Sequence, residues 1–451
     1  MSAAAESLDQ RFADAMGQLL GPDFPTDIAL AVSGGGDSMA MLTLAHNWTR
    51  RWGVKLWVVT VDHALRPESA DEARMVAEDC AALGHPHATL RWDWDGKGNV
   101  QAEARRARLA LIDQWRGSLR HVLMAHTRDD LAETFLMRLK RGSGIDGLAA
   151  MRPARPVSRQ PRVPGKLSGA TPPHRQTGDT GFTILRPCLG MRRTELRHYL
   201  TTLKGRWVDD PSNEDHGYER VRMRSLLAEL APNGLGVDTI AKTAARMARS
   251  REVLQRRAAE VWDQIGQETR ALDVPTGEIV FDRDGFFAIE PDTQRRLLAA
   301  ALHYVASADY APRADAVEQA LDLLFSGGVT TLHGCELRCE KTQVHVFREY
   351  RAVRDRIEPA DGETLWDDRW RVFPQDMRRL SVRALGDAGW QQIPVRTPGT
   401  PPHLTARSLP SLWDGNKLVA CAAMGFGPTH AVQLLPMRQG VPDFRGFLLS
   451  H

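Results

Sequence analysis

The sequence predicts an α/β fold in which a doubly wound parallel sheet is followed by a helical middle domain and a small α+β C-terminal domain. Two observations predict the sheet. Strand patterns alternate with helical patterns over residues 25–150, and a glycine-rich turn follows the first strand. Strands that alternate with helices pair in parallel through right-handed crossovers, which place helices on both faces of the sheet.

Short apolar runs and helical periodicity give the elements of this first domain. A glycine ends three of the helical patterns, and Ser69 with Glu72 forms a predicted capping box at the start of one of them. In chain order, we predict strands at residues 27–32, 55–62, 88–94 and 121–125, and helices at residues 39–52, 69–83, 100–115 and 129–140.

Periodicity changes beyond residue 150. Residues 152–180 are rich in Pro, Gly, Arg and Ser and have no period, so we predict a mobile basic insertion, with or without a role of its own. Further on, the pattern predicts helices at 219–267, 293–307 and 313–325, a strand pair at 278–289, a hairpin at 330–348 and short strands after 350. We expect three domains: the α/β domain at 1–217, a mostly helical domain at 218–350 and a small C-terminal domain at 351–451.

Composition excludes several classes of protein. A chain of 451 residues with 42% hydrophobic residues can form two or three cored domains and is not intrinsically disordered. Its most apolar stretches, 28–32 and 56–61, are too short to cross a membrane, and the first 20 residues lack the apolar core of a signal peptide. The five cysteines are scattered and odd in number, which disfavours a disulfide framework and favours the cytoplasm.

Charge is unevenly distributed along the chain. The formal net charge is only +3, yet residues 151–260 contain 21 Lys and Arg against 11 Asp and Glu. A basic middle region between more acidic flanks is typical of a protein that binds a polyanion such as nucleic acid. An ordinary arginine-rich surface is the alternative.

The strongest chemical signal is a loop between the first strand and the first helix. Backbone N–H groups of consecutive glycines can wrap an anion, and the helix N-terminus adds partial positive charge. No Gly-Lys-Ser/Thr follows, so the loop is not of the Walker type. A carboxylate there would repel phosphate unless it serves a cation, so we predict Mg²⁺ at Asp37. The loop, predicted to bind phosphate, consists of Ser33, Gly34, Gly35, Gly36, Asp37 and Ser38.

This loop resembles the SGGxDS pyrophosphate loop of the N-type ATP pyrophosphatases, the PP-loop superfamily. Further blocks in order resemble the tRNA(Ile)-lysidine synthetases over roughly residues 25–230. Leu109, Val221 and the length of 152–180 depart from that pattern, but none of these departures removes a charged group. The blocks are residues 61–66, Asn99 with 104–108, 125–134, 141–144, 147–148 and 210–213.

Candidate site residues lie in these blocks. Arg105 and Arg108 share a helix face and could hold the triphosphate or the departing pyrophosphate, or could simply be solvated. His126 follows a strand at the sheet's carboxyl edge, where open α/β sheets bind ligands. Asp130 and Glu133 share a helix face near its N-terminus. The resemblance implies that they bind the ammonium groups of lysine, whereas helix capping or Mg²⁺ binding are the alternatives.

The resemblance implies a cytoplasmic ATP-dependent ligase. The C2 oxygen of the wobble cytidine in tRNA(Ile) with a CAU anticodon would attack ATP, and free L-lysine would then displace AMP to give lysidine. In this scheme Asp37, His126, Arg105 and Arg108 are catalytic, the loop from Ser33 to Ser38 binds ATP, the cofactors are ATP and Mg²⁺, and the chain is a possible homodimer. Residues 1–217 would be the catalytic domain, 218–350 a tRNA-binding domain and 351–451 a tRNA-recognition domain. The alternatives are a PP-loop enzyme that thiolates a tRNA base and a non-catalytic tRNA-binding protein.

Overall fold

The structure is a computed structural model of the chain. It describes residues 6–65, 68–174, 181–209, 217–308, 310–374, 380–428, 430–435, 441 and 443–450. Arg66 and residues 210–213 of the quoted blocks lie outside these ranges, as do 175–180 of the predicted insertion. The chain forms two compact units, Met1–Arg251 and Glu252–His451. Among the described residues, none of the helices combines the length and apolar character that a membrane crossing requires.

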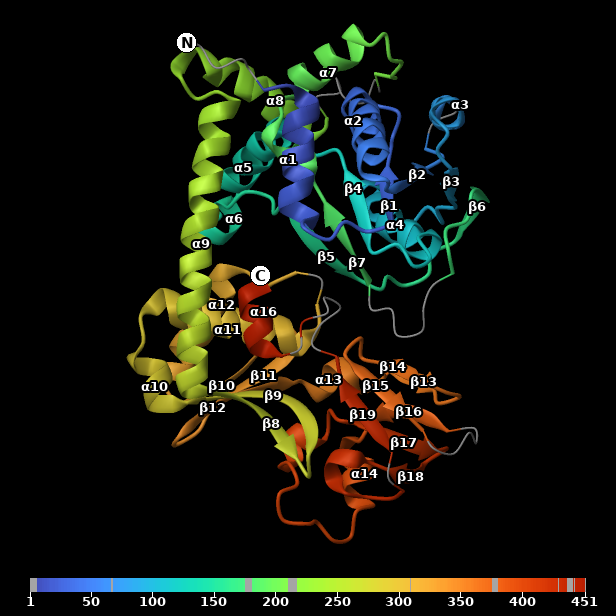
Figure 1. Cartoon of the computed structure of the whole chain (residues 1–451). Coiled ribbons are helices and arrows are strands. Elements are labelled where there is room, and N and C mark those ends of the chain that lie inside the picture. The colour runs from blue at the N-terminus through green and yellow to red at the C-terminus, as the bar shows by residue number, and fades with distance from the viewer. Residues whose placement is uncertain are drawn as a thin grey trace. The chain divides into compact units, whose positions relative to one another are not determined.

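The first unit is built around a seven-stranded sheet in the order β5-β7-β4-β1-β2-β3-β6 (Figure 1). The inner five strands are parallel, and the two edge strands are antiparallel to their neighbours. The strands are β1 (Asp27–Ala31), β2 (Lys55–Asp62), β3 (His87–Trp92), β4 (His121–Met124), β5 (Ala154–Ser158), β6 (Gly165–Gly169) and β7 (Gly181–Leu185). The helices are α1 (Leu8–Leu20), α2 (Gly36–Trp52), α3 (Ser69–Leu83), α4 (Val100–Trp115), α5 (Arg128–Lys140), α6 (Ile145–Leu148), η1 (Pro187–Gly190), α7 (Arg193–Thr202), α8 (Glu219–Leu230) and η3 (Ala231–Asn233); α9 (Val237–Ile265) spans the boundary between the units.

The strand order contains a reversal at β1. From β1 the chain continues to β2 and β3 on one side, then returns through α4 to β4 and β7 on the other side. Ligands of open α/β sheets bind outside the carboxyl ends of the strands at such a reversal. The loop after β1 and the residues that follow β4 therefore lie at the expected ligand position.

Helices cover both faces of this sheet, as a doubly wound fold requires. Ile28 and Leu30 of β1 pack with side chains from α1, α2, α3 and α7. Ala29, which points the other way, packs with Val59 of β2 and with α4. Because successive side chains of a strand alternate between faces, the apolar residues 28–31 of β1 contribute to the cores on both faces of the sheet. The predicted α/β fold class is confirmed.

Some local predictions differ from the structure. The helix at Ser69–Leu83 begins where predicted, but Glu68 occupies the N-cap and its side chain makes no cap hydrogen bond, so the capping-box prediction is wrong. The capping box lies instead at Thr127 and Asp130, where α5 begins. Within the predicted insertion, Ala154–Ser158 and Gly165–Gly169 form edge strands that pair with β7 and β3. Cross-strand pairing, which periodicity does not report, orders these segments.

The second unit contains a five-stranded antiparallel sheet, β10-β11-β12-β9-β8, and two smaller sheets, β13-β16-β17-β18 and β14-β15-β19. Side chains from the end of α9 and from α11, α12 and α16 cover the larger sheet. The strands are β8 (Gly266–Ala271), β9 (Val274–Asp282), β10 (Val329–Leu332), β11 (Cys335–Cys339), β12 (Gln343–Arg348), β13 (Ile357–Pro359), β14 (Thr364–Trp366), β15 (Trp370–Phe373), β16 (Ser381–Ala384), β17 (Pro410–Asp414), β18 (Lys417–Ala420) and β19 (Ala431–Leu434). The helices are α10 (Arg283–Ala288), α11 (Pro291–Ala306), α12 (Ala314–Phe325), α13 (Tyr350–Val353), α14 (Gly386–Gln391), α15 (His403–Ala406), η4 (Ala422–Met424) and α16 (Phe444–Ser450).

One predicted element of this unit is wrong. Residues 278–289 are not a strand pair, because the strand ends at Asp282, whose side chain caps α10 through a 2.7 Å hydrogen bond from the Gly285 N–H.

Buried arginines tie the sheets of the unit together. Arg369 donates hydrogen bonds to the carbonyl oxygens of Val305 and Gly277, both at 2.8 Å.

Candidate active site

The glycine-rich loop leads directly from β1 into α2. Gly34 has φ of +83°, a conformation that favours glycine, and Gly35 is the N-cap of the helix. The Ser38 hydroxyl donates to the Gly35 carbonyl at 2.9 Å and accepts from the Ser33 N–H at 3.2 Å, which closes the turn. The first N–H groups of a helix have no acceptor within the helix, so Gly36 and Asp37 present theirs at the helix N-terminus.

Asp37 stands in the first turn of α2 and is partly buried. Its Oδ2 accepts a hydrogen bond from Arg193 Nε at 3.0 Å, whereas its buried Oδ1 has no hydrogen-bond partner among the described residues. Burial raises the pKa of Asp37, and the neighbouring charge of Arg193 opposes that rise. An unsatisfied carboxylate oxygen beside a phosphate-binding loop fits a divalent cation, because Mg²⁺ prefers oxygen ligands.

Asp130 has a structural role as well as a place in the site. One carboxylate oxygen, Oδ2, accepts hydrogen bonds from the Thr127 N–H at 2.8 Å and from the Thr127 hydroxyl at 2.9 Å, which completes the capping box. The other oxygen, Oδ1, lies 3.5 Å from Arg193 Nη2. Burial would raise the pKa of Asp130, but the charges of Arg220 and Arg193 and the Thr127 hydrogen bond lower it.

Glu133 lies one turn further along α5, and its side chain is only 1% exposed. Its Oε1 accepts hydrogen bonds from Arg193 Nη1 and Arg224 Nε, both at 3.1 Å. Its Oε2 has no hydrogen-bond partner among the described residues, and Arg220 Nε lies 3.9 Å away. A buried carboxylate needs cationic partners to remain ionised, so α7 and α8 both contribute to this position.

Arg193 joins the three predicted carboxylates into one cluster. The guanidinium group contacts Asp37, Asp130 and Glu133 at 3.0, 3.5 and 3.1 Å. Burial alone would lower the pKa of Arg193, but the three carboxylates raise it. The Arg193 backbone N–H also donates to Asp129 Oδ2 at 2.8 Å, which anchors the start of α7 to α5. The structure thus brings together residues that are up to 156 positions apart.

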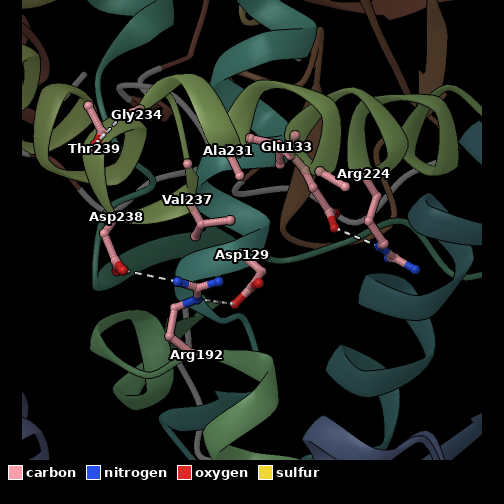
Figure 2. Close-up of a pocket in the computed structure, with 12 residues that line it drawn as sticks. Asp129, Glu133, Arg192, Arg224, Ala231, Gly234, Val237, Asp238 and Thr239 are labelled. Atoms are coloured by element: carbon pink, nitrogen blue, oxygen red, sulfur yellow. Dashed lines mark hydrogen bonds and ion pairs between the residues drawn. The ribbon is translucent and has the colours of Figure 1, made fainter.

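A cavity of about 450 Å³ adjoins this cluster (Figure 2). Glu133 and Arg224 point toward each other on one side of the cavity, and Arg192 lies between Asp129 and Asp238 on the other. Carboxylates and guanidinium groups therefore line the same space. A ligand that carries both an ammonium group and a carboxylate would find complementary charges there.

Arginines gather on the other side of the site. Arg108 Nη2 lies 3.3 Å from His63 Nε2, and His63 follows β2 at the carboxyl edge of the sheet. Burial and the charge of Arg108 lower the pKa of His63 to about 4, so its imidazole is neutral and can accept this hydrogen bond. Arg105, one turn earlier on α4, is exposed.

His126 follows β4 within this basic region. Burial, the charge of Arg186 and the weaker effects of Arg220 and Arg105 lower the pKa of His126 to about 4, against the opposing effect of Asp130. The imidazole is therefore neutral near pH 7 and acts as a hydrogen-bonding group, not as a cation. Its buried Nδ1 has no hydrogen-bond partner among the described residues.

The sequence analysis missed Arg193 and Arg186. Arg186 directly follows β7, donates to the Arg152 carbonyl at 2.7 Å, and has its pKa lowered to about 10 by burial and by Arg155 and Arg105. The apolar run 182–185 marks a strand whose carboxyl end enters the site next to β4. This strand is not among the predicted elements; it would have indicated Arg186, which follows it directly, but not Arg193, which lies beyond η1.

Comparison with known proteins identifies the family. A family model described as a PP-loop domain matches residues 8–231. The tRNA(Ile)-lysidine synthase of Ruegeria pomeroyi is 37% identical over 430 residues, which cover 95% of each chain. That of Hyphomonas neptunium is 35% identical and covers 74% of this chain and 84% of its own. Among solved structures, the U34-tRNA thiolase NcsA of Methanococcus maripaludis is 14% identical, with a TM-score of 0.40 over 53% of this chain and 78% of its own.

The relatives match both units of this chain, and the PP-loop model coincides with the unit that holds the glycine-rich loop. The resemblance to the PP-loop superfamily is thus confirmed, together with the expectation of an enzyme that uses ATP. The chain is a ligase and belongs to the tRNA(Ile)-lysidine synthase family.

Proposed function

We propose that this enzyme joins L-lysine to C2 of the wobble cytidine of a CAU-anticodon tRNA(Ile) and thereby forms lysidine. The C2 oxygen attacks the α-phosphorus of ATP, a new C–O–P linkage forms, and pyrophosphate leaves. The ε-amine of lysine then attacks C2, AMP leaves with the former C2 oxygen, and the amine loses a proton. Adenylylation is needed because the C2 oxygen is a poor leaving group by itself.

One observation carries this proposal: a phosphate-binding loop and a buried acidic cluster share one site. The loop from Ser33 to Ser38 holds the phosphates of ATP at the N-terminus of α2. Asp130 and Glu133, which Arg193 links to Asp37 of that loop, are placed to bind the ammonium groups of lysine. ATP and lysine would therefore bind next to each other, at carboxylates that contact the same guanidinium group.

We assign the remaining residues by charge. Asp37, with its unsatisfied Oδ1, would hold Mg²⁺, which supplies charge neutralisation at the phosphates when bound. Arg105 and Arg108 neutralise the negative charge that develops on the departing pyrophosphate. His126, whose pKa of about 4 keeps it neutral, accepts or donates a hydrogen bond beside the reacting base.

Two alternative functions have less support. Thiolation of a tRNA base needs a reactive sulfur group. Four of the five cysteines, Cys80, Cys188, Cys335 and Cys421, are buried, and burial raises the pKa of each of these thiols, so only the partly exposed Cys339 is accessible as a nucleophile. A non-catalytic tRNA-binding protein would have no use for the three carboxylates that the structure gathers around Arg193.

Residues 218–350 and 351–451 are proposed to bind the tRNA. The exposed arginines of α9, Arg246 and Arg249, provide positive charge for RNA phosphates. Arg257 of the same helix instead forms a 2.9 Å ion pair with Glu290. A homodimer and a cytoplasmic location stay predictions.

The test is a direct assay of the product. Purified enzyme is incubated with Mg-ATP, isotopically labelled L-lysine and unmodified CAU-anticodon tRNA(Ile), and the digested nucleosides are analysed by mass spectrometry. We expect labelled lysidine and one pyrophosphate per lysidine. Pyrophosphate without lysidine would leave adenylylation in place and refute the lysine acceptor role. Neither product, from a folded sample that binds the tRNA, would refute the proposed reaction.

A further inference from the structure

We infer that Arg193 is a positioning residue that acts as an internal counter-ion: in the ligand-free enzyme it offsets part of the negative charge of the three carboxylates of the site, and it releases them to the cationic groups of the substrates. This inference rests on the proposed function, which assigns Asp37 to Mg²⁺ and Asp130 and Glu133 to lysine.

The geometry shows an arginine that serves three partners at once. Arg193 Nε, Nη2 and Nη1 contact Asp37, Asp130 and Glu133 respectively, and the side chain is 17% exposed. The partners come from α2 and α5, two separate elements of the sheet's carboxyl edge. A single planar guanidinium cannot make ideal bidentate pairs with three carboxylates, and its contact with Asp130 Oδ1 is correspondingly long at 3.5 Å.

Oxygen atoms on the same carboxylates remain available. Asp37 Oδ1 and Glu133 Oε2 are buried and have no hydrogen-bond partner among the described residues. Leaving buried acceptors unsatisfied is costly, so both oxygens favour the arrival of a further cation or donor. The arginine therefore compensates the charge of the cluster without satisfying its hydrogen-bonding capacity.

An incoming cation competes with Arg193 for the negative charge of these carboxylates. Arg193 contacts Asp37 Oδ2 and Glu133 Oε1, so a cation that binds the open oxygen of either carboxylate interacts with the same negative charge that Arg193 already compensates. By linkage, the free energy that Arg193 gains from these contacts is subtracted from the affinity of each substrate cation. The backbone N–H of Arg193 stays bonded to Asp129, so the side chain can swing away while α7 remains in place.

The test measures ligand binding by the full-length protein. We would titrate wild type, Arg193→Gln and Arg193→Lys with L-lysine and, separately, with MgCl₂ in an isothermal calorimeter at pH 8. Arg11→Gln is the matched control. Arg11 forms a partly buried 2.6 Å ion pair with Glu195, which lies on α7 as Arg193 does, and it contacts none of the three carboxylates in the structure.

We expect Arg193→Gln to bind L-lysine roughly tenfold more tightly than wild type, because the competing charge is gone. Arg193→Lys, which keeps a charge but has no planar fork to bridge three carboxylates, should fold like wild type and bind with intermediate affinity. Arg11→Gln should bind as wild type does. L-lysine and Mg²⁺ should also raise the melting temperature of Arg193→Gln more than that of wild type.

If Arg193 had only a structural role, its substitution would weaken L-lysine binding instead of strengthening it. Equal or weaker L-lysine binding by a folded Arg193→Lys, with wild-type binding intact, would overturn the counter-ion role and leave the proposed function standing. Failure of every variant and of wild type to bind L-lysine would overturn both, because Asp130 and Glu133 would then not be a lysine site.

Discussion

The two sides of the active site differ in how their charges are compensated. On the acidic side, Asp37, Asp130 and Glu133 share the guanidinium group of Arg193. On the basic side, Arg105, Arg186 and Arg220 surround His126, and their combined charge contributes to its low pKa of about 4. Arg186 meets a carbonyl oxygen rather than a carboxylate.

This difference indicates which kind of ligand each side is expected to bind. The negative charge of the acidic side is partly compensated from within, by Arg193 and Arg224, while Asp37 Oδ1 and Glu133 Oε2 stay open to the cationic substrates. On the basic side, Asp130 and Glu133 relieve the repulsion between like charges only in part, through Arg220 at 4.0 and 3.9 Å, so this side gains most from a polyanionic ligand such as ATP, pyrophosphate or RNA. Substitutions on the two sides should therefore have different effects on stability and on catalysis.

The largest effect is expected at Asp37, the carboxylate of the acidic side that belongs to the phosphate loop. Asp37→Ala removes the carboxylate that faces both the phosphate loop and Arg193. We expect lysidine formation to fall by roughly 10²–10³-fold or more, because a charge-stabilising group of the reaction is lost. Pyrophosphate release with Mg-ATP and tRNA measures the effect. Asp71→Asn, at an exposed acid of α3, is the control, and equal activity of Asp37→Ala and wild type would contradict the assignment.

Breaking the acidic side should affect both stability and lysine binding. Glu133→Gln leaves Arg193 and Arg224 without their shared partner. We expect a loss of about 2–4 kcal/mol in the free energy of unfolding and a KM for lysine higher by roughly 10–100-fold. Urea denaturation and steady-state kinetics measure the two effects. An unchanged KM for lysine would remove Glu133 from the lysine site.

Reducing the charge of the basic side should separate catalysis from stability. Arg105→Gln and Arg108→Gln together should slow pyrophosphate release by roughly tenfold or more. The free energy of unfolding should change by no more than about 0.5 kcal/mol, because exposed residues among like charges contribute little to it. A large loss of stability with normal activity would show that these arginines are structural.

The pH dependence of stability should sharpen the comparison further. The folded pKa of His126 is about 4, below the ordinary value of 6.5, so the unfolded chain binds more protons between these values. Stability should therefore fall as the pH is lowered from about 6.5 to about 4, by at most about 1.4 kcal/mol per pH unit for each such histidine. Differential scanning calorimetry of His126→Gln should show a shallower decline, whereas an identical decline would contradict the shift.

The smallest effect is expected away from the site, on α9. Arg246→Glu with Arg249→Glu should weaken tRNA binding and reduce the log–log salt slope by about two, because each exposed arginine contributes one phosphate contact. ATP affinity should not change. Adding Arg257→Glu should have little further effect, since Arg257 is already paired with Glu290. Filter binding over a range of salt concentrations tests this, and an unchanged slope would exclude the helix from the tRNA interface.

The sequence by itself determined those features of the protein that depend on residues close together in the chain. Apolar runs and glycine turns predicted the parallel core of the first unit, from β1 to α5, because periodicity and turn chemistry are local properties. The phosphate loop is contiguous, so its residues could be identified before the fold was known. Asp130 and Glu133 could be recognised as a pair, since residues three apart share a helix face.

Only the tertiary structure decided how distant charges meet. Arg193 lies 156 positions from Asp37, and nothing in its own segment predicts that its guanidinium group would bridge α2 and α5. Likewise, the edge strands β5 and β6 form because β7 and β3 offer pairing partners. The strand pair expected at residues 278–289 failed because Asp282 caps a helix there. Long-range pairing and capping competed with local propensity in each case, and the three-dimensional contacts prevailed.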